Sequence, residues 1–505
     1  MTAIAPTMES YRAQAQRHGL LFVLGLAGLT TLTGLWLLSV DGDAATLAWL
    51  VFLIHAAVIL YNPRYGLYTT LWLTLSCDFT LTRWDPFTTN FSSEWSIFYL
   101  GGWAVFSPLE LSLVLVVVSW LLRAAGRRRL AFVPGALALP MLLFVMVLAF
   151  GLAYGIGTGG SINIALWESR YIFYLPLVYF IVCNVLDDRR QVNNLMWLAA
   201  TALFYEGIWG VVYVAGELGW DLSLVQSITE HSAAIHMNTL FILIAVTLLY
   251  GGSWARKLAL PAMAPVVFFT YIATQRRAAF VTLAVGLMLV AVVMYRTHRR
   301  LFWTIVPALS VVGMLYLGAF WNNTGALGMP AQAIKSATVG SEAEAHSDDY
   351  RKMENVNSNF TIHQKPLTGV GFGNKFFVLI VLPDISFFPM WEYIPHNSVI
   401  WMWIKTGVVG FVVYLFMVGA SIVKGAQVFN VLNDNTYRPL ILAWTIYWVM
   451  HFVYAYVDMS WDSQSTVYLG VTAGVIGHME NLLARPLPPE PASPYWGTGH
   501  ALGEI

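Results

Sequence analysis

The sequence predicts an all-α, polytopic membrane protein with about fourteen transmembrane helices. Three observations carry this prediction. Apolar residues make up 58% of the 505 residues and charged residues only 11%, whereas soluble domains average about 45–50% and about 25%. Apolar runs close to the roughly 20 residues that span a bilayer core as a helix recur along the chain. Basic residues also concentrate in alternate breaks between these runs, as the positive-inside rule requires.

The predicted spans follow one another with short polar breaks. They cover approximately residues 20–40, 44–61, 65–82, 107–122, 136–154, 171–186, 195–215, 233–250, 258–273, 278–295, 301–320, 398–421, 440–457 and 466–483. No small-residue cleavage signal follows the first run, so we expect a retained first helix rather than a removed signal peptide. Residues 1–505 are expected to form a single polytopic membrane domain, ending in a tail at 484–505.

The orientation of the spans follows from the lysines and arginines in the breaks. Seventeen of the 27 basic residues lie in one alternating set of breaks: Arg12, Arg17, Arg64, Arg123, Arg127, Arg128, Arg129, Arg189, Arg190, Arg256, Lys257, Arg296, Arg299, Arg300, Lys424, Arg438 and Arg485. This set is expected to face the cytoplasm. Both termini and the tail are then cytoplasmic. The longest break, residues 321–397 before the twelfth span, is then a periplasmic or extracytoplasmic loop.

The composition excludes several functions. The 27 basic and 27 acidic side chains cancel, so net charge offers no argument for a nucleic-acid partner, and none is expected. The two cysteines, Cys77 and Cys183, lie in apolar runs, which excludes a disulfide framework and a cysteine zinc site. We expect neither a metal nor a cofactor.

Some arginines interrupt the charge pattern by lying in short breaks expected to face outward. They are Arg83, Arg170, Arg276 and Arg277. Arg170, Arg276 and Arg277 open the sixth and tenth spans, and His396-Asn397-Ser398 opens the twelfth. Helix N-termini carry unpaired N–H groups and a partial positive charge, and arginine forks suit phosphate oxygens. If these three helix ends converge, they form a site for a phosphate or pyrophosphate at the outer membrane face.

The long loop adds further candidate residues. Loops of this length are usually functional or disordered. It contains Arg351 and the run Gly369-Val370-Gly371-Phe372-Gly373, whose alternating glycines allow positive φ or close backbone approach. Without a strand before it and a helix after it, this run does not indicate a dinucleotide fold. The loop returns to the membrane through Trp391-Glu392-Tyr393-Ile394-Pro395-His396.

The return segment carries a resemblance to a known family. Pro395-His396-Asn397-Ser398, followed by Lys405-Thr406-Gly407-Val408-Val409-Gly410, resembles the signature of the bacterial O-antigen ligase and O-antigen polymerase superfamily. The outward arginine and the glycine run match the same pattern, so the resemblance covers about residues 275–410. The sequence departs from the pattern at Lys405, where relatives often carry an acidic residue.

The resemblance implies a GT-C-like glycosyltransferase of the bacterial cytoplasmic (inner) membrane, with its active site facing outward. Its substrates would be an undecaprenyl-pyrophosphate-linked oligosaccharide and a glycan or lipid acceptor. It implies that Arg276 and Arg277, and less specifically Arg170, bind the donor pyrophosphate, and that His396 is catalytic and acts on the acceptor hydroxyl. Substrate or loop support is expected from Arg351, Glu392, Asn397 and Asp458.

The residue types indicate how such a transfer would work. Arginines and helix N-termini can stabilise a leaving pyrophosphate without a metal. A histidine with an ordinary pKa near 6.5 can take the acceptor proton near neutral pH. We therefore expect metal-independent transfer with inversion at the sugar C1.

The sequence leaves three functions open. Polymerisation of an O-antigen or exopolysaccharide repeat unit is slightly favoured, because the loop is long and no pocket for a lipid A core is recognisable. Ligation of a finished glycan to a lipid or protein acceptor needs the same donor site. A secondary transporter or flippase of lipid-linked sugars is the third, but such proteins favour ionisable residues near the bilayer midplane. Here the unusual charges lie at the outer edge.

Overall fold

The computed structural model describes residues 32, 44–78, 80–81, 87–94, 96–126, 131–225, 227–323, 325–338, 342–386 and 388–484. Within these ranges the regular structure is entirely helical. Ten of the described helices are long and apolar enough to cross a membrane, which confirms the prediction of an all-α, polytopic membrane protein. The predicted first span and the tail after Ala484 lie outside the described residues.

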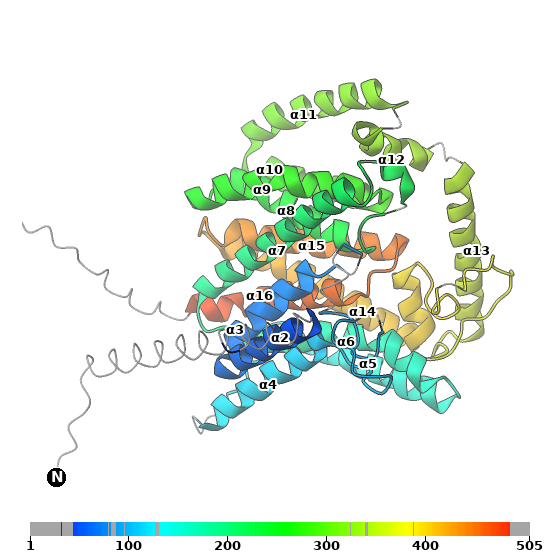
Figure 1. The fold of residues 1–505 in the computed structure, drawn as a ribbon. Helices are drawn as coiled ribbons and strands as arrows, with labels where there is room; N and C mark the ends of the chain where they lie inside the picture. Colours follow the sequence, from blue (N-terminus) through cyan, green and yellow to red (C-terminus); the bar gives the residue numbers. More distant parts are fainter. Residues whose placement is uncertain are drawn as a thin grey trace, which may run out of the picture.

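The helices run as follows in chain order: α2 (Ala44–Tyr61), α3 (Pro63–Ser76), α4 (Pro108–Gly126), α5 (Ala138–Gly157), α6 (Ile162–Val185), α7 (Arg189–Gly216), α8 (Ala233–Tyr250), α9 (Trp254–Ala273), α10 (Arg277–Thr297), α11 (Arg299–Phe320), α12 (Met329–Thr338), α13 (Glu342–Gln364), α14 (Ser398–Val431), α15 (Arg438–Val457) and α16 (Ser463–Ala484). Most of them form one bundle, and α13 runs crosswise over one end of it (Figure 1). We call this the α13 end of the bundle.

Several boundaries differ from the prediction. Helix α3 has 14 residues, so at a rise of about 1.5 Å per residue it is shorter than a bilayer core. Helix α6 starts at Ile162 instead of near residue 171, because Ser161 caps it by accepting a hydrogen bond from the Ile164 N–H. Arg170 therefore lies inside α6, and the prediction that it opens this helix is wrong. The predicted loop 321–397 contains α12 and α13.

Small residues bring the central helices close together. Gly470 and Gly474 of α16 face Val178 and Val182 of α6, where an added Cβ would lie within 3 Å of the valine side chains. Close approach at glycines is how helices associate in lipid, where apolar burial offers little driving force. By contrast, none of the residues of α11 is buried, and this helix lies at the edge of the bundle (Figure 1), as a lipid-facing helix would.

The glycine run of the loop joins α5, α6 and α14. Gly369, Gly371 and Gly373 have φ of 66°, 80° and 83°, which confirms the expected positive φ. Their backbone packs against helix backbone: the Phe372 N–H donates to the Gly151 carbonyl (3.1 Å) and the Ser161 N–H donates to the Gly373 carbonyl (3.0 Å).

The Gly371→Ala substitution should destabilise the protein. A Cβ on Gly371 would lie 2.3 Å from the Gly155 Cα, in a backbone conformation that L side chains rarely adopt. Strain and overpacking together should lower the free energy of unfolding by about 2–4 kcal/mol. Denaturant unfolding in detergent measures the change. Gly313→Ala in α11, where nothing lies within 4 Å of the added Cβ, is the control, and equal effects of the two substitutions would contradict the packing role.

A kink in α14 lies beside the same run. Gly407 has φ 71° and ψ −175° inside the helix, which interrupts its hydrogen bonding. The loop backbone supplies replacements: the Val370 N–H donates to the Ile404 carbonyl (2.7 Å) and the Val408 N–H donates to the Pro366 carbonyl (3.0 Å). The first part of α14, which begins just after His396, is therefore fixed to the loop.

Helix α13 holds the next part of the loop through buried polar side chains. The Asn357 amide oxygen accepts hydrogen bonds from the N–H groups of Leu379 and Ile380, both at 2.8 Å. The Thr361 hydroxyl accepts one from the Phe377 N–H at 2.8 Å. Asn357 and Thr361 are fully buried, so residues 377–380 are tied firmly to α13.

Candidate functional site

His396 lies between the loop and α14 and bonds to Glu354 of α13. Its Nδ1 is 3.0 Å from Glu354 Oε2, and its backbone N–H donates to the same oxygen at 2.8 Å. A carboxylate accepts hydrogen bonds, so Nδ1 donates its proton and Nε2 carries the free lone pair. The Glu354 side chain is 2% exposed and that of His396 is 19% exposed. A buried carboxylate thus orients a histidine that remains accessible.

A second carboxylate, Asp458, lies just after α15 and gathers further groups. Its oxygens are 3.2 and 3.3 Å from His231 Nδ1, and the Arg351 guanidinium is 3.8 Å from Oδ2. Burial would raise the pKa of Asp458, but the His231 hydrogen bond and the charges of His231, Arg351 and Arg276 outweigh it and hold this pKa well below its ordinary value. Asp458 is therefore a carboxylate throughout the physiological pH range.

Arg276 occupies the N-cap position of α10. The preceding residue, Gln275, has φ 54°, and its amide donates to the carbonyls of Leu222 (2.8 Å) and Val225 (2.9 Å). These bonds fix the turn that presents Arg276 close enough for its charge to act on Asp458. Arg277 follows as the first residue of α10.

Arg276 and Arg351 each keep an unused donor. Both Nε atoms are buried and have no hydrogen-bond partner in the described part of the chain. A guanidinium offers five donors in a planar fork that matches phosphate oxygens. Both side chains are therefore candidates to bind an anion.

Two of the three predicted helix ends contribute groups to the surroundings of Asp458. The Ser398 hydroxyl, at the start of α14, donates to the Asp458 carbonyl at 3.1 Å, and the start of α10 carries Arg276. The start of α8 joins them, because His231 directly precedes its N-cap residue, Ser232. Helix N-termini favour anions, so the backbone adds to the positive charge of the arginines.

Arg170 lies in a different environment. One guanidinium nitrogen donates to the Asn90 side chain (2.8 Å) and to the Val105 carbonyl (2.9 Å), and the other terminal nitrogen donates to the Tyr171 hydroxyl (2.8 Å). No contact of the described residues joins Arg170 to Asp458. Its bonds tie α6 to the chain between α3 and α4, and a role in donor binding stays a prediction.

Glu392 and Asn397 support the loop and helix next to His396. Glu392 forms an ion pair with Lys375, and its carbonyl accepts from the Phe376 N–H at 3.1 Å. Asn397 is the N-cap of α14, where its side chain accepts a hydrogen bond from the Ile400 N–H at 3.0 Å. These two predicted site residues thus hold the backbone on either side of His396.

Lys405, where the sequence departs from the family pattern, is buried in an ion pair. Its Nζ is 2.7 Å from Glu168 Oε1 and donates to the Asn374 carbonyl at 2.6 Å. Glu168 Oε2 accepts from the Gly373 N–H at 2.6 Å. Both charged side chains are 0% exposed, so the pair joins α6, α14 and the glycine run.

Sequence reasoning missed Glu354, His231 and Glu168 as important residues. Glu168 lies in an apolar stretch, where an ionisable residue is a signal worth following. Glu354 lies in a strongly polar stretch and His231 is an isolated histidine. Their roles arise from contacts 42 and 227 residues away along the chain, and no local pattern records those.

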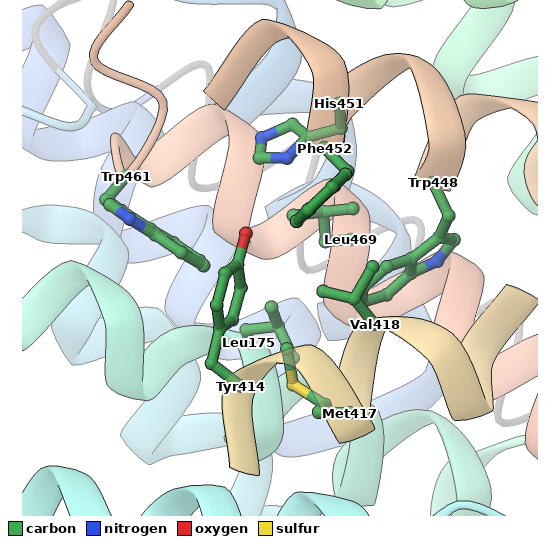
Figure 2. Close-up of a pocket in the computed structure, with 9 residues that line it drawn as sticks. All are labelled: Leu175, Tyr414, Met417, Val418, Trp448, His451, Phe452, Trp461 and Leu469. Carbon is green, nitrogen blue, oxygen red and sulfur yellow. The ribbon is translucent and has the colours of Figure 1, made fainter. Parts of the chain in front are cut away.

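A narrow hollow lies between α6, α14, α15 and α16, apart from the charged groups. It is too tight to hold a water molecule, and Tyr414, Trp448, His451 and Trp461 are among the residues that line it. The Tyr414 hydroxyl points into it (Figure 2). The indole N–H of Trp461 also donates to the Ser398 carbonyl at 3.4 Å. This aromatic cluster is therefore bonded to the first residue of α14.

The fold and these groups define a class of protein: a multi-pass membrane protein with arginines and histidine–carboxylate pairs gathered where several helices begin. Residues 262–415 match the family model described as O-antigen ligase. Over this part of the chain the resemblance to the O-antigen ligase and polymerase superfamily is confirmed. The matched segment runs from α9 into α14. No curated protein matches the chain.

Proposed function

We propose that this protein is an inner-membrane glycosyltransferase that takes glycan from an undecaprenyl-pyrophosphate-linked donor, with the α13 end facing outward. The observation that carries the proposal is that α13 brings Arg351, which faces Asp458 at 3.8 Å, within one helical turn of Glu354, the carboxylate that holds His396. Arg276, at the start of α10, acts on the same Asp458 through its charge. Anion-binding groups beside an accessible base are what transfer from a pyrophosphate to a hydroxyl requires.

His396 acts as the base in this proposal. Its Nε2 lone pair takes the proton of the acceptor hydroxyl while the acceptor oxygen attacks the sugar C1. Glu354 fixes the tautomer through Nδ1 and stabilises the imidazolium that forms. One displacement of this kind inverts the configuration at C1.

Arg276 and Arg351 hold the donor pyrophosphate. Their charges stabilise the negative charge that grows on the leaving oxygen as the C1–O bond breaks. Arg277, next to Arg276 at the start of α10, adds a third positive charge to this end of the helix. Because these groups supply the electrostatic stabilisation themselves, we propose that transfer is independent of a metal.

Polymerisation of lipid-linked repeat units and ligation of a finished glycan both use this donor site, and the family match suits both equally. A transporter of lipid-linked sugars is supported less well, because transporters favour ionisable residues near the bilayer midplane, whereas His396 lies just before the start of α14. The identity of the acceptor therefore separates the two leading reactions.

The proposal predicts glycan transfer by the purified protein. Reconstituted into nanodiscs with an undecaprenyl-pyrophosphate oligosaccharide, the wild type should transfer glycan at an equal rate with and without EDTA. A ladder formed from the donor alone indicates a polymerase, and product formed only with an added acceptor indicates a ligase. No transfer in either assay would contradict the proposed function, and activity that EDTA abolishes and divalent cation restores would contradict the metal-independent mechanism.

Arg276→Ala should raise the KM for the donor about 10- to 100-fold, because a charge-assisted hydrogen bond contributes about 1.5–3 kcal/mol. The matched control is Arg299→Ala. Arg299 begins α11, beyond the far end of α10, where it stacks on Tyr295. An Arg276→Ala variant with the wild-type KM would show that the donor binds elsewhere.

A further inference from the structure

His231 and His396 share one arrangement. In each, Nδ1 bonds to a carboxylate that is 3% exposed or less, Asp458 for His231 and Glu354 for His396. The His231 side chain is 36% exposed, and no hydrogen bond of the described residues engages its Nε2. Ser398, two residues after His396, donates to the Asp458 carbonyl at 3.1 Å. Two anchored histidines therefore lie at the same site, each with Nε2 open.

The backbone around His231 is held on both sides. The Tyr454 hydroxyl donates to the His231 carbonyl, and the Glu230 N–H donates to Asp78 Oδ2 at 2.8 Å. The Ser227 hydroxyl donates to the Thr229 carbonyl at 3.0 Å. An exposed surface histidine does not need this many restraints, whereas a group that must meet a substrate at a fixed position does.

Asp458 connects His231 to the proposed donor site. The Asp458 carboxylate that bonds to His231 is also the one whose pKa the charges of Arg351 and Arg276 lower. An anion held between these arginines therefore comes close to the imidazole of His231. The His396–Glu354 pair, in contrast, shares its carboxylate with no arginine in the described part of the chain.

We propose that His231 is a second catalytic residue, which donates a proton from Nε2 to the leaving pyrophosphate. This inference rests on the proposed function. As the C1–O bond breaks, its electron pair goes to the pyrophosphate oxygen, which takes the His231 proton. The acceptor oxygen forms the new bond to C1 and gives its proton to His396. His396 then loses one proton to solvent and His231 regains one, which restores both side chains.

The surroundings of His231 suit this role. Asp458 accepts the Nδ1–H of His231, so the imidazole keeps that proton while Nε2 gives up its own. The two histidines act as acid and base, each held by its own carboxylate.

The test compares His231→Gln with the wild type in reconstituted nanodiscs. We expect kcat to fall about 10²-fold, at the low end of general acid–base effects, with a donor KM within about threefold of wild type. The melting temperature should stay at the wild-type value. A purely structural residue would instead change stability, or change kcat and the donor KM together.

A histidine outside the site provides the control. His363→Gln changes an exposed histidine on α13 and should keep the wild-type kcat.

The outcomes separate the two proposals. An active wild type with an unchanged kcat in His231→Gln overturns the role of His231 alone. A wild type that transfers no glycan overturns the proposed function and this inference together. If His231→Gln unfolds at a lower temperature than wild type, His231→Asn provides the second variant, and normal activity in that variant also overturns the inference.

Discussion

His396→Ala is expected to lower the rate of glycan transfer about 10²–10⁴-fold, the usual contribution of a general base. The variant should keep the wild-type melting temperature and donor KM, because the proposed donor groups remain in place. The steady-state rate with the lipid-linked donor measures the effect. His363→Ala changes an exposed histidine on α13 and should leave the rate within twofold of wild type.

Replacement of the partner carboxylate tests the geometry around the base. Glu354→Gln keeps the size of the side chain but replaces the carboxylate that holds Nδ1. Its rate should fall between those of the wild type and His396→Ala. In the His396→Ala background, Glu354→Gln should have little further effect, because the two residues act as one unit. Rates that fall independently would show that Glu354 acts apart from His396.

Lys405→Met alone should lower the free energy of unfolding by about 3–5 kcal/mol, the usual effect of breaking a buried ion pair from one side. Glu168 would keep its charge in a fully buried position, with hydrogen bonds from the Gly373 N–H and Trp401 but no positive charge beside it. Thermal or denaturant unfolding in detergent measures the loss. The double variant Lys405→Met, Glu168→Gln should recover most of it, because no unpaired charge remains.

The control for Lys405 lies further along the same helix. Lys424 pairs with Glu480 at 2.8 Å, but the Glu480 side chain is 51% exposed. Lys424→Met should therefore change stability by no more than about 1 kcal/mol. A Lys405→Met variant as stable as Lys424→Met would mean that Glu168 finds water or a proton in place of the lysine.

The sequence predicted local features well and spatial neighbours poorly. Composition and apolar run length predicted the class of fold, and Gly369, Gly371 and Gly373 have the expected backbone conformation. The start of α6 was misplaced, because Glu168 and Arg170 look like the end of a span when only hydropathy is read. In the structure their charges are satisfied by other segments of the chain.

The candidate site was likewise predictable only where the signal is local. Arg276 and His396 could be predicted as site residues because each lies at an abrupt change from apolar to polar sequence, next to a helix start. Asp458 was included, but its partner His231 was not. The contacts that join them depend on which helices are neighbours in the bundle, and hydropathy along one chain carries no information about that.

Helix α13 carries residues for both functions of the proposed site, which are donor binding and orientation of the base. Arg351, Glu354, Asn357 and Thr361 recur at intervals of three or four residues and so share one face of the helix. Arg351 faces the Asp458 carboxylate and Glu354 bonds to His396, whereas Asn357 and Thr361 bond to the backbone of the loop. A movement of α13 would therefore shift Arg351 and Glu354 together, so one helix couples part of the donor site to the orientation of the base.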